Sequence, residues 1–160
     1  MHRGFTTSLI AVALAGLVLS VAAADPGKSG RVKFVKRADD ICQPFRAEAQ
    51  ARVAHGVRLL ERKHHPSVRR AGRHFVTAWR LMREAYRKVD DVHRPDGYRK
   101  KIANWLSLEF HATSLGVRSA IWLKRGHFYK ARRLSHRAAV GEQTAARIVR
   151  NFDFDHCTPL

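Results

Sequence analysis

The sequence predicts an all-α fold, an up-down-up-down four-helix bundle closed by one disulfide bond. Apolar residues recur at helical spacing in four segments, Pro- and Gly-containing turns separate these segments, and nothing resembles a strand. Short turns make successive helices antiparallel, so the end of the fourth helix returns to the start of the first. The only two cysteines lie near those two places, which agrees with the predicted topology.

Residues 1–24 are predicted to be a secretory signal peptide. Arg3 is followed by an apolar run over residues 9–21 and by three alanines that end at Ala24. An uncleaved membrane anchor is the alternative, but the apolar run is shorter than the roughly 20 residues that a spanning helix needs. We therefore expect cleavage near Ala24 and a protein that is secreted or held in the extracytoplasmic envelope.

Residues 25–37 contain Pro, Gly and Ser and are predicted to form a flexible leader. The four-helix bundle is predicted over residues 38–157, with residues 158–160 as a C-terminal tail. Asp39 and Asp40 are expected to supply the N-cap of the first helix.

The four helices are placed by their apolar period and by the turns between them. The first helix is expected to end near Lys63. The second is expected from Pro66 to Asp90, the third over about Asp96–Arg125 and the fourth over Phe128–Phe152. The second helix has the clearest pattern, because Val68, Phe75, Met82 and Val89 recur every seven residues. The third helix is apolar around more of its circumference, which leaves room for a homodimer through that helix.

Cys42 and Cys157 are predicted to form one disulfide bond, because an exported chain passes through an oxidising compartment. The sequence contains no Cys-x-x-Cys motif, so a structural role is favoured over a redox pair.

The chain contains the segment Ala38-Asp39-Asp40-Ile41-Cys42 and a second cysteine, Cys157, close to the C-terminus, and this combination is found in other proteins. It resembles a loose group of small, mostly uncharacterised exported helical proteins from high-G+C Gram-positive bacteria. In that group, an Ala-Asp-x-Ile-Cys start accompanies a cysteine just before the C-terminus. The resemblance implies the same fold and compartment, and it implies no particular activity.

The chain has a formal net charge of +18, and the predicted bundle separates its charges along the long axis. Seven acids are expected at the end that holds the cysteines, an acidic pole made of Asp39, Asp40, Asp90, Asp91, Asp96, Asp153 and Asp155. Ten cations are expected at the opposite end, a basic pole made of Arg62, Lys63, Arg69, Arg70, Arg73, Lys124, Arg125, Lys130, Arg132 and Arg133. Only Glu61 offsets these ten, so the molecule is predicted to be electrically lopsided.

The basic pole is the predicted anion-binding site, because clustered arginines bind phosphate and carboxylate groups and attract polyanions. Anionic envelope polymers or anionic lipid surfaces are the expected partners, and no physiological nucleic acid is expected for an exported protein. The alternative is a structural or stress-tolerance helical protein without a specific ligand, in which the charge only provides solubility.

A buried ion pair between Arg52 and Glu109 is predicted from the helical phase. Both residues fall within apolar stripes, and each lies about 12 or 13 residues from the cysteine end, so they are expected in one layer of the bundle. A catalytic Glu109 is the rival interpretation, although the sequence offers it no obvious partner base or nucleophile.

The chain is not expected to be an enzyme, and no catalytic residue, metal or cofactor is assigned. It contains no Gly-x-Ser-x-Gly, no phosphate-binding Gly loop and no Cys-x-x-Cys-His haem-attachment motif. A cation site with oxygen ligands at the acidic pole is a weaker alternative to helix capping by the same aspartates, because the spacing of an EF-hand is missing.

Overall fold

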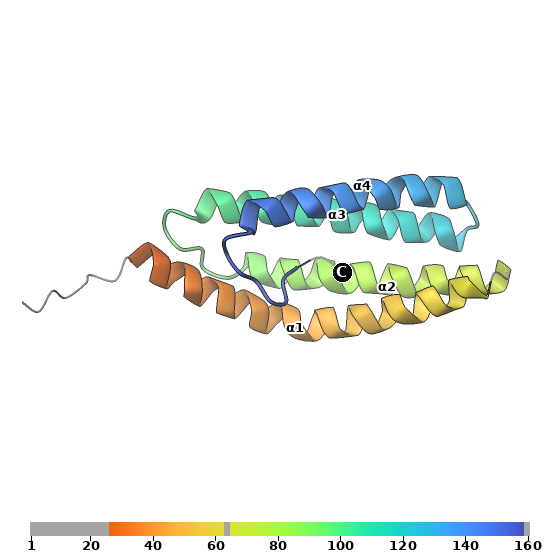
Figure 1. Cartoon of the computed structure of the whole chain (residues 1–160), viewed down its shortest axis with the longest axis horizontal. Helices are drawn as coiled ribbons and strands as arrows, with labels where there is room; N and C mark the ends of the chain where they lie inside the picture. The colour runs from red at the N-terminus through yellow and green to blue at the C-terminus, as the bar shows by residue number, and fades with distance from the viewer. Residues whose placement is uncertain (1–25, 63–64, 159–160) are drawn as a thin grey trace, which may run out of the picture.

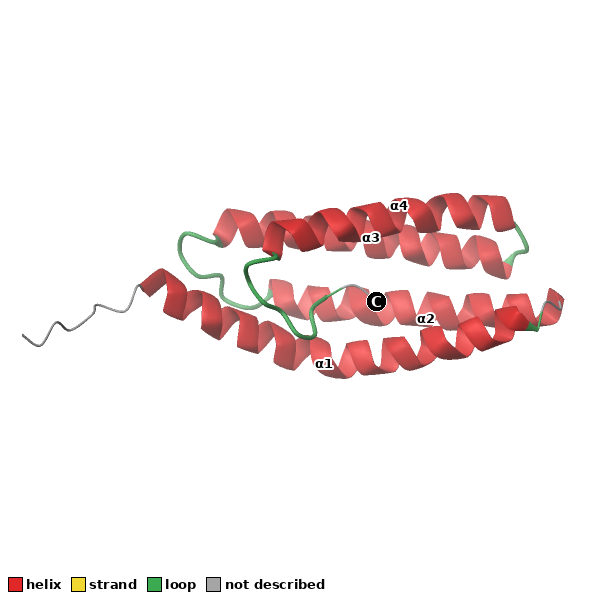
Figure 2. Ribbon diagram, in the orientation of Figure 1, coloured by secondary structure: helices red, strands yellow, loops and turns green. Residues whose placement is uncertain are grey.

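The computed structural model describes residues 26–62 and 65–158, and it confirms the predicted four-helix bundle (Figures 1 and 2). The four helices are α1 (Pro26–Glu61), α2 (His65–Asp90), α3 (Arg99–Lys124) and α4 (Phe128–Val149). Successive helices run in opposite directions, and the segment after α4 turns back along the bundle (Figure 1). The predicted signal peptide, Lys63 and residues 159–160 lie outside the described residues. Among those described, no helix combines the length and apolarity needed to cross a membrane.

The prediction of a flexible leader over residues 25–37 is wrong for the part that is described, because α1 begins at Pro26. Phe34 and Ala38 lie four residues apart on one face of α1, and only 2% and 0% of their surface is exposed. The ring of Phe34 packs edge-on against Phe152, with 6.5 Å between the ring centroids. This burial stabilises a helix that the Pro, Gly and Ser residues alone did not predict.

The core is concentrated in the half of the bundle that contains the disulfide bond. Val68, Met82 and Val89 of α2 are buried as their seven-residue repeat predicts, whereas Phe75 is only half-buried. Trp105 of α3 is completely buried, and its ring stacks on Phe154 with 4.8 Å between centroids.

Small residues bring α3 close to both of its neighbours. A methyl group added at Gly72 of α2 would lie 2.7 Å from the backbone nitrogen of Lys124 in α3. One added at Gly141 of α4 would lie 3.2 Å from the Cβ of Ala112 in α3. This packing buries part of the apolar surface of α3 that suggested a homodimer, and none of the large apolar side chains left exposed among the described residues belongs to α3. The homodimer itself stays a prediction.

The bundle is open along one side. Helix α1 packs on α2, α2 on α3 and α3 on α4, but no Cα atom of α1 lies within 8 Å of one in α4. Near the disulfide bond, the segment over residues 150–158 occupies this gap (Figure 1). The predicted bond is confirmed, with a Cα–Cα distance of 5.3 Å between Cys42 and Cys157.

Candidate functional site: a basic pole beside an apolar groove

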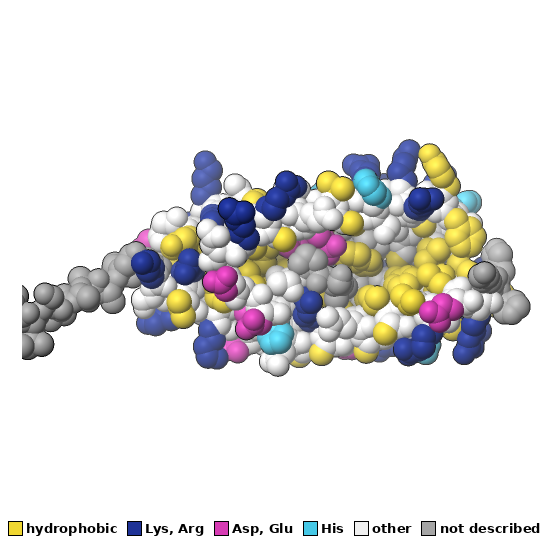
Figure 3. Space-filling model, in the orientation of Figure 1, with side chains coloured by type: hydrophobic (Ala, Val, Ile, Leu, Met, Phe, Trp, Pro, Cys, Tyr) yellow, Lys and Arg dark blue, Asp and Glu magenta, His cyan; other side chains and the backbone are white. Residues whose placement is uncertain are grey.

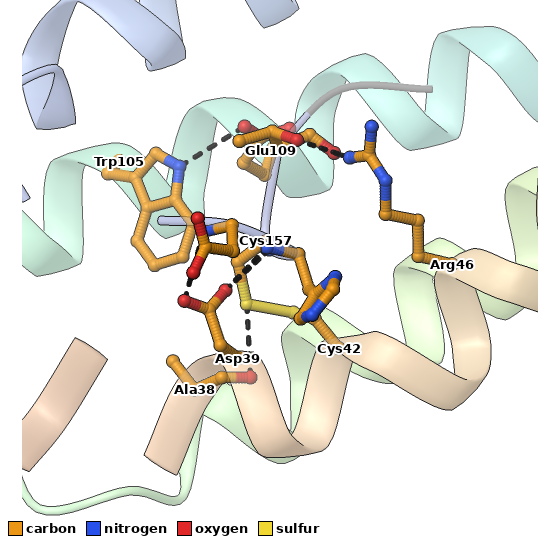
Figure 4. The surroundings of a disulfide bond; sticks show 10 residues. Ala38, Asp39, Cys42, Arg46, Trp105, Glu109 and Cys157 are labelled. Atoms are coloured by element: carbon orange, nitrogen blue, oxygen red, sulfur yellow. Dashed lines mark hydrogen bonds between the residues drawn. A yellow bond between two sulfur atoms is a disulfide. The ribbon is translucent and has the colours of Figure 1, made fainter. Parts of the chain in front are cut away.

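The C-terminal segment is held on α1 by Asp39 as well as by the disulfide bond (Figure 4). The Oδ1 atom of Asp39 accepts hydrogen bonds from the backbone amides of His156 at 2.7 Å and Cys157 at 2.9 Å, and its Oδ2 atom accepts one from Asp155 at 3.0 Å. The prediction that Asp39 caps the start of a helix is therefore wrong. Because α1 begins earlier than expected, Asp39 lies within the helix and its carboxylate binds three successive backbone amides of another segment.

Glu109 is buried as predicted, but it does not pair with Arg52. Arg52 is exposed and forms an ion pair with Glu48, one turn away on α1, at 3.0 Å. Two features of the fold keep Arg52 and Glu109 apart. Helix α1 turns Ala49 and Gly56 toward the core, so Arg52 lies on its solvent side. Helix α1 also lies diagonally across the bundle from α3, and no Cα atom of one lies within 8 Å of a Cα atom of the other.

The environment of Glu109 favours its protonated form. Burial, and after it the negative charge of Glu142, raises the pKa of Glu109 to about 8. The indole Nε1–H of Trp105 donates to Oε1 at 3.1 Å, and this bond and the Tyr86 hydroxyl act in the opposite direction on the pKa. Among the described residues, no donor reaches Oε2. The α1 arginine that approaches this region is Arg46, which donates to Thr158 of the C-terminal segment (Figure 4).

The two turns expected to form the basic pole do lie at the same end of the bundle, the end away from the turn between α2 and α3 (Figure 1). Nine of its ten cations are described, and all nine are exposed. Within residues 26–62 and 65–158, none of the nine forms a salt bridge. Lys130 and Arg125 lie over the ring of Trp122, with 4.6 Å and 5.4 Å to its centroid.

The acidic pole is not the uniformly acidic surface that the sequence predicted. Because the expected leader is helical, five cations of α1 lie at the same end, namely Lys28, Arg31, Lys33, Lys36 and Arg37. Asp40 pairs with Lys36 at 2.9 Å, Asp96 pairs with Arg99 at 2.9 Å, and Asp90 pairs with Arg94. In the part of the chain that the structure describes, no three His, Cys, Asp or Glu side chains are grouped so that they could hold a metal ion.

An apolar groove, which sequence reasoning missed, lies in the open side of the bundle next to the basic pole. Figure 3 shows hydrophobic side chains gathered in a hollow between α4 and α1, with Lys and Arg on both sides. The groove has a volume of about 660 Å³, and nine of its twelve lining residues are apolar or aromatic. All four helices contribute, and the lining includes Val53, Leu60, Phe75, Trp79, Leu123 and Phe128.

Two glycines make room for the aromatic floor of the groove. Gly56 of α1 faces Phe75, whose Cε1 atom would lie 2.7 Å from a methyl group at that position. Gly116 of α3 faces Trp79 so closely that a methyl group would overlap the indole ring. The buried hydroxyl of Ser119 donates to the backbone carbonyl of Ala131 at 2.8 Å, so the floor presents no free hydroxyl at this point.

Substitution Gly116→Ala is expected to destabilise the fold by about 1 to 3 kcal/mol, because the indole of Trp79 must shift to admit the methyl group. Chemical denaturation measures this loss, and tryptophan fluorescence of the native protein reports the shift. Ser107→Ala is the matched control, since Ser107 is exposed on the same helix, the change adds no group to the interior, and alanine favours a helix. Equal stability of the Gly116 variant and the wild type would contradict the proposed packing.

The geometry defines a disulfide-linked helical bundle with an open apolar side and a cationic end. No family model, characterised protein or solved structure shows significant similarity to the chain. The resemblance to exported proteins with an Ala-Asp-x-Ile-Cys start therefore stays a prediction. The apolar pattern of the fourth segment begins at Phe128, but the pattern alone gave no sign of the groove, because only the structure shows that 51% of this side chain is exposed.

Proposed function

We propose that the protein is an exported binding module that contacts anionic envelope polymers or lipid headgroups through its basic pole, without catalysing a reaction. The observation that carries this proposal is the cluster of nine exposed cations at one end, none of them in a salt bridge among the described residues. Concentrated charge of one sign attracts polyanions over about a Debye length, roughly 8 to 10 Å at moderate ionic strength.

Reversal of four arginines at the basic pole, Arg69, Arg70, Arg132 and Arg133, to glutamate is expected to abolish retention on anionic liposomes and on polyphosphate beads. Wild-type retention should fall steeply as salt is raised, because exposed charges are screened. Both effects are measured by co-sedimentation over a salt series.

The matched control reverses four exposed cations away from the basic pole, namely Lys28, Arg83, Lys100 and Arg150. It changes the net charge by the same amount and is expected to keep most of the retention. If both variants lose retention equally, binding depends on net charge alone. If both variants are retained as well as the wild type, the structural or stress-tolerance alternative is favoured.

A further inference from the structure

The apolar groove exists because the fourth side of the bundle is only half closed. The C-terminal segment fills the half of this open side that lies nearer the disulfide bond, where Phe152 and Cys157 are buried. Nothing among the described residues fills the half of the open side that lies nearer the basic pole, and Phe75 and Trp79 remain partly exposed there. Its volume of about 660 Å³ lies within the range of about 300 to 1,000 Å³ that is usual for small-molecule sites.

The rim of the groove carries both aromatic surface and positive charge. Phe128 is 51% exposed and Tyr129 is 78% exposed, both in the first turn of α4. Arg132 lies one turn further along α4 and lines the groove itself. An exposed aromatic pair beside a cation is the combination found where proteins contact the boundary between acyl chains and headgroups.

We infer that the groove binds an acyl chain of an anionic lipid and that Arg132 contacts the charged headgroup. The inference rests on the proposed function, because it assigns the acyl part of the lipid whose headgroup the basic pole attracts. Two complementary matches carry it. The apolar groove suits the acyl chain, and the exposed cations at its edge suit the negatively charged headgroup. A polyanion without an acyl chain would leave the groove empty.

The test titrates the purified protein with octyl, decyl and dodecyl phosphate below their micelle concentrations, using calorimetry and tryptophan fluorescence. The Kd is expected to fall about fourfold for each added methylene until the groove is full, which corresponds to about 0.8 kcal/mol per methylene. Inorganic phosphate is expected to bind far more weakly than dodecyl phosphate. Arg132→Ser is expected to raise the Kd of dodecyl phosphate about tenfold and to leave binding of neutral dodecyl maltoside unchanged.

Two tryptophan substitutions separate the groove from the rest of the surface. Ser135→Trp places an indole in the groove from an exposed lining position and is expected to remove the dependence on chain length. Ser107→Trp adds the same side chain at an exposed position of α3 outside the groove and is expected to keep it. Both variants are expected to keep salt-dependent retention on polyphosphate beads.

Three results would overturn the inference. Equal affinity for inorganic phosphate and dodecyl phosphate assigns binding to the headgroup alone and leaves the proposed function standing. Equal affinity for dodecyl phosphate and dodecyltrimethylammonium removes the preference for an anion. If the wild-type protein self-associates and Ser135→Trp abolishes this association, the groove binds a second copy of the protein and not a lipid. Loss of polyphosphate retention in wild-type protein, by contrast, is a failure of the proposed function.

Discussion

Removal of the disulfide bond by Cys42→Ala with Cys157→Ala is expected to lower the free energy of unfolding by about 4 to 5 kcal/mol. The two cysteines are 115 residues apart, so the bond restricts almost the whole helical domain in the unfolded state. In the chain-entropy treatment, the stabilisation grows with the logarithm of the closed loop. Urea denaturation of the wild type and the double variant measures the difference.

The same substitution is expected to loosen the C-terminal segment in the folded state. After the bond is removed, the hydrogen bonds of Asp39 and the burial of Phe152 and Phe154 still hold this segment. These contacts are weaker than a covalent bond, so hydrogen exchange at the amides of residues 156 and 157 should accelerate in the wild type when a reductant breaks the disulfide bond. The variant should not respond to the reductant. A loss of stability below about 1 kcal/mol would contradict the structural role assigned to the bond.

The stability contributed by Glu109 is expected to fall as the pH rises from 5 to 8. The pKa of this carboxyl is 4.5 in its ordinary state and about 8 in the fold, so between these values the folded protein holds one more proton than the unfolded chain. The free energy of unfolding then decreases by about 1 kcal/mol for each pH unit, a few kcal/mol in all. Glu109→Gln keeps an acceptor for Trp105 and removes the titrating proton, so the difference in stability between wild type and variant should change with this slope.

The difference between the two proteins isolates Glu109 from the other titrating groups. His74 acts with the opposite sign, because burial, followed by the positive charges of His55, Arg52 and Arg73, lowers its pKa below 6.5. Its contribution therefore rises with pH and cancels in the difference. Glu48→Gln, which removes an exposed carboxylate, is the matched control and should change the slope much less. A difference that is flat between pH 5 and 8 would show that Glu109 is not a protonated buried acid.

The presence of the four helices and the pairing of the two cysteines could be predicted from the spacing of apolar residues and turns along the sequence. The seven-residue repeat of α2 places Val68, Met82 and Val89 on one face wherever the helix lies. The direction of α1 and the turn lengths bring Cys42 and Cys157 to one place in any antiparallel bundle. The start of α1 could not be read in this way, because Phe34 stabilises it through contact with Phe152, more than 100 residues away.

The amino-acid sequence by itself determined the four amphipathic segments, the excess of cations around two turns and the single disulfide bond. Only the tertiary structure decided that α1 and α4 stand apart, that Arg52 faces solvent, and that the C-terminal segment covers half of the open side. The physical reason is that helical spacing sets which residues share a face. The distance and rotation between two faces depend on packing through every intervening helix, and here Gly72, Gly116 and Gly141 draw α2, α3 and α4 together while α1 and α4 remain separated.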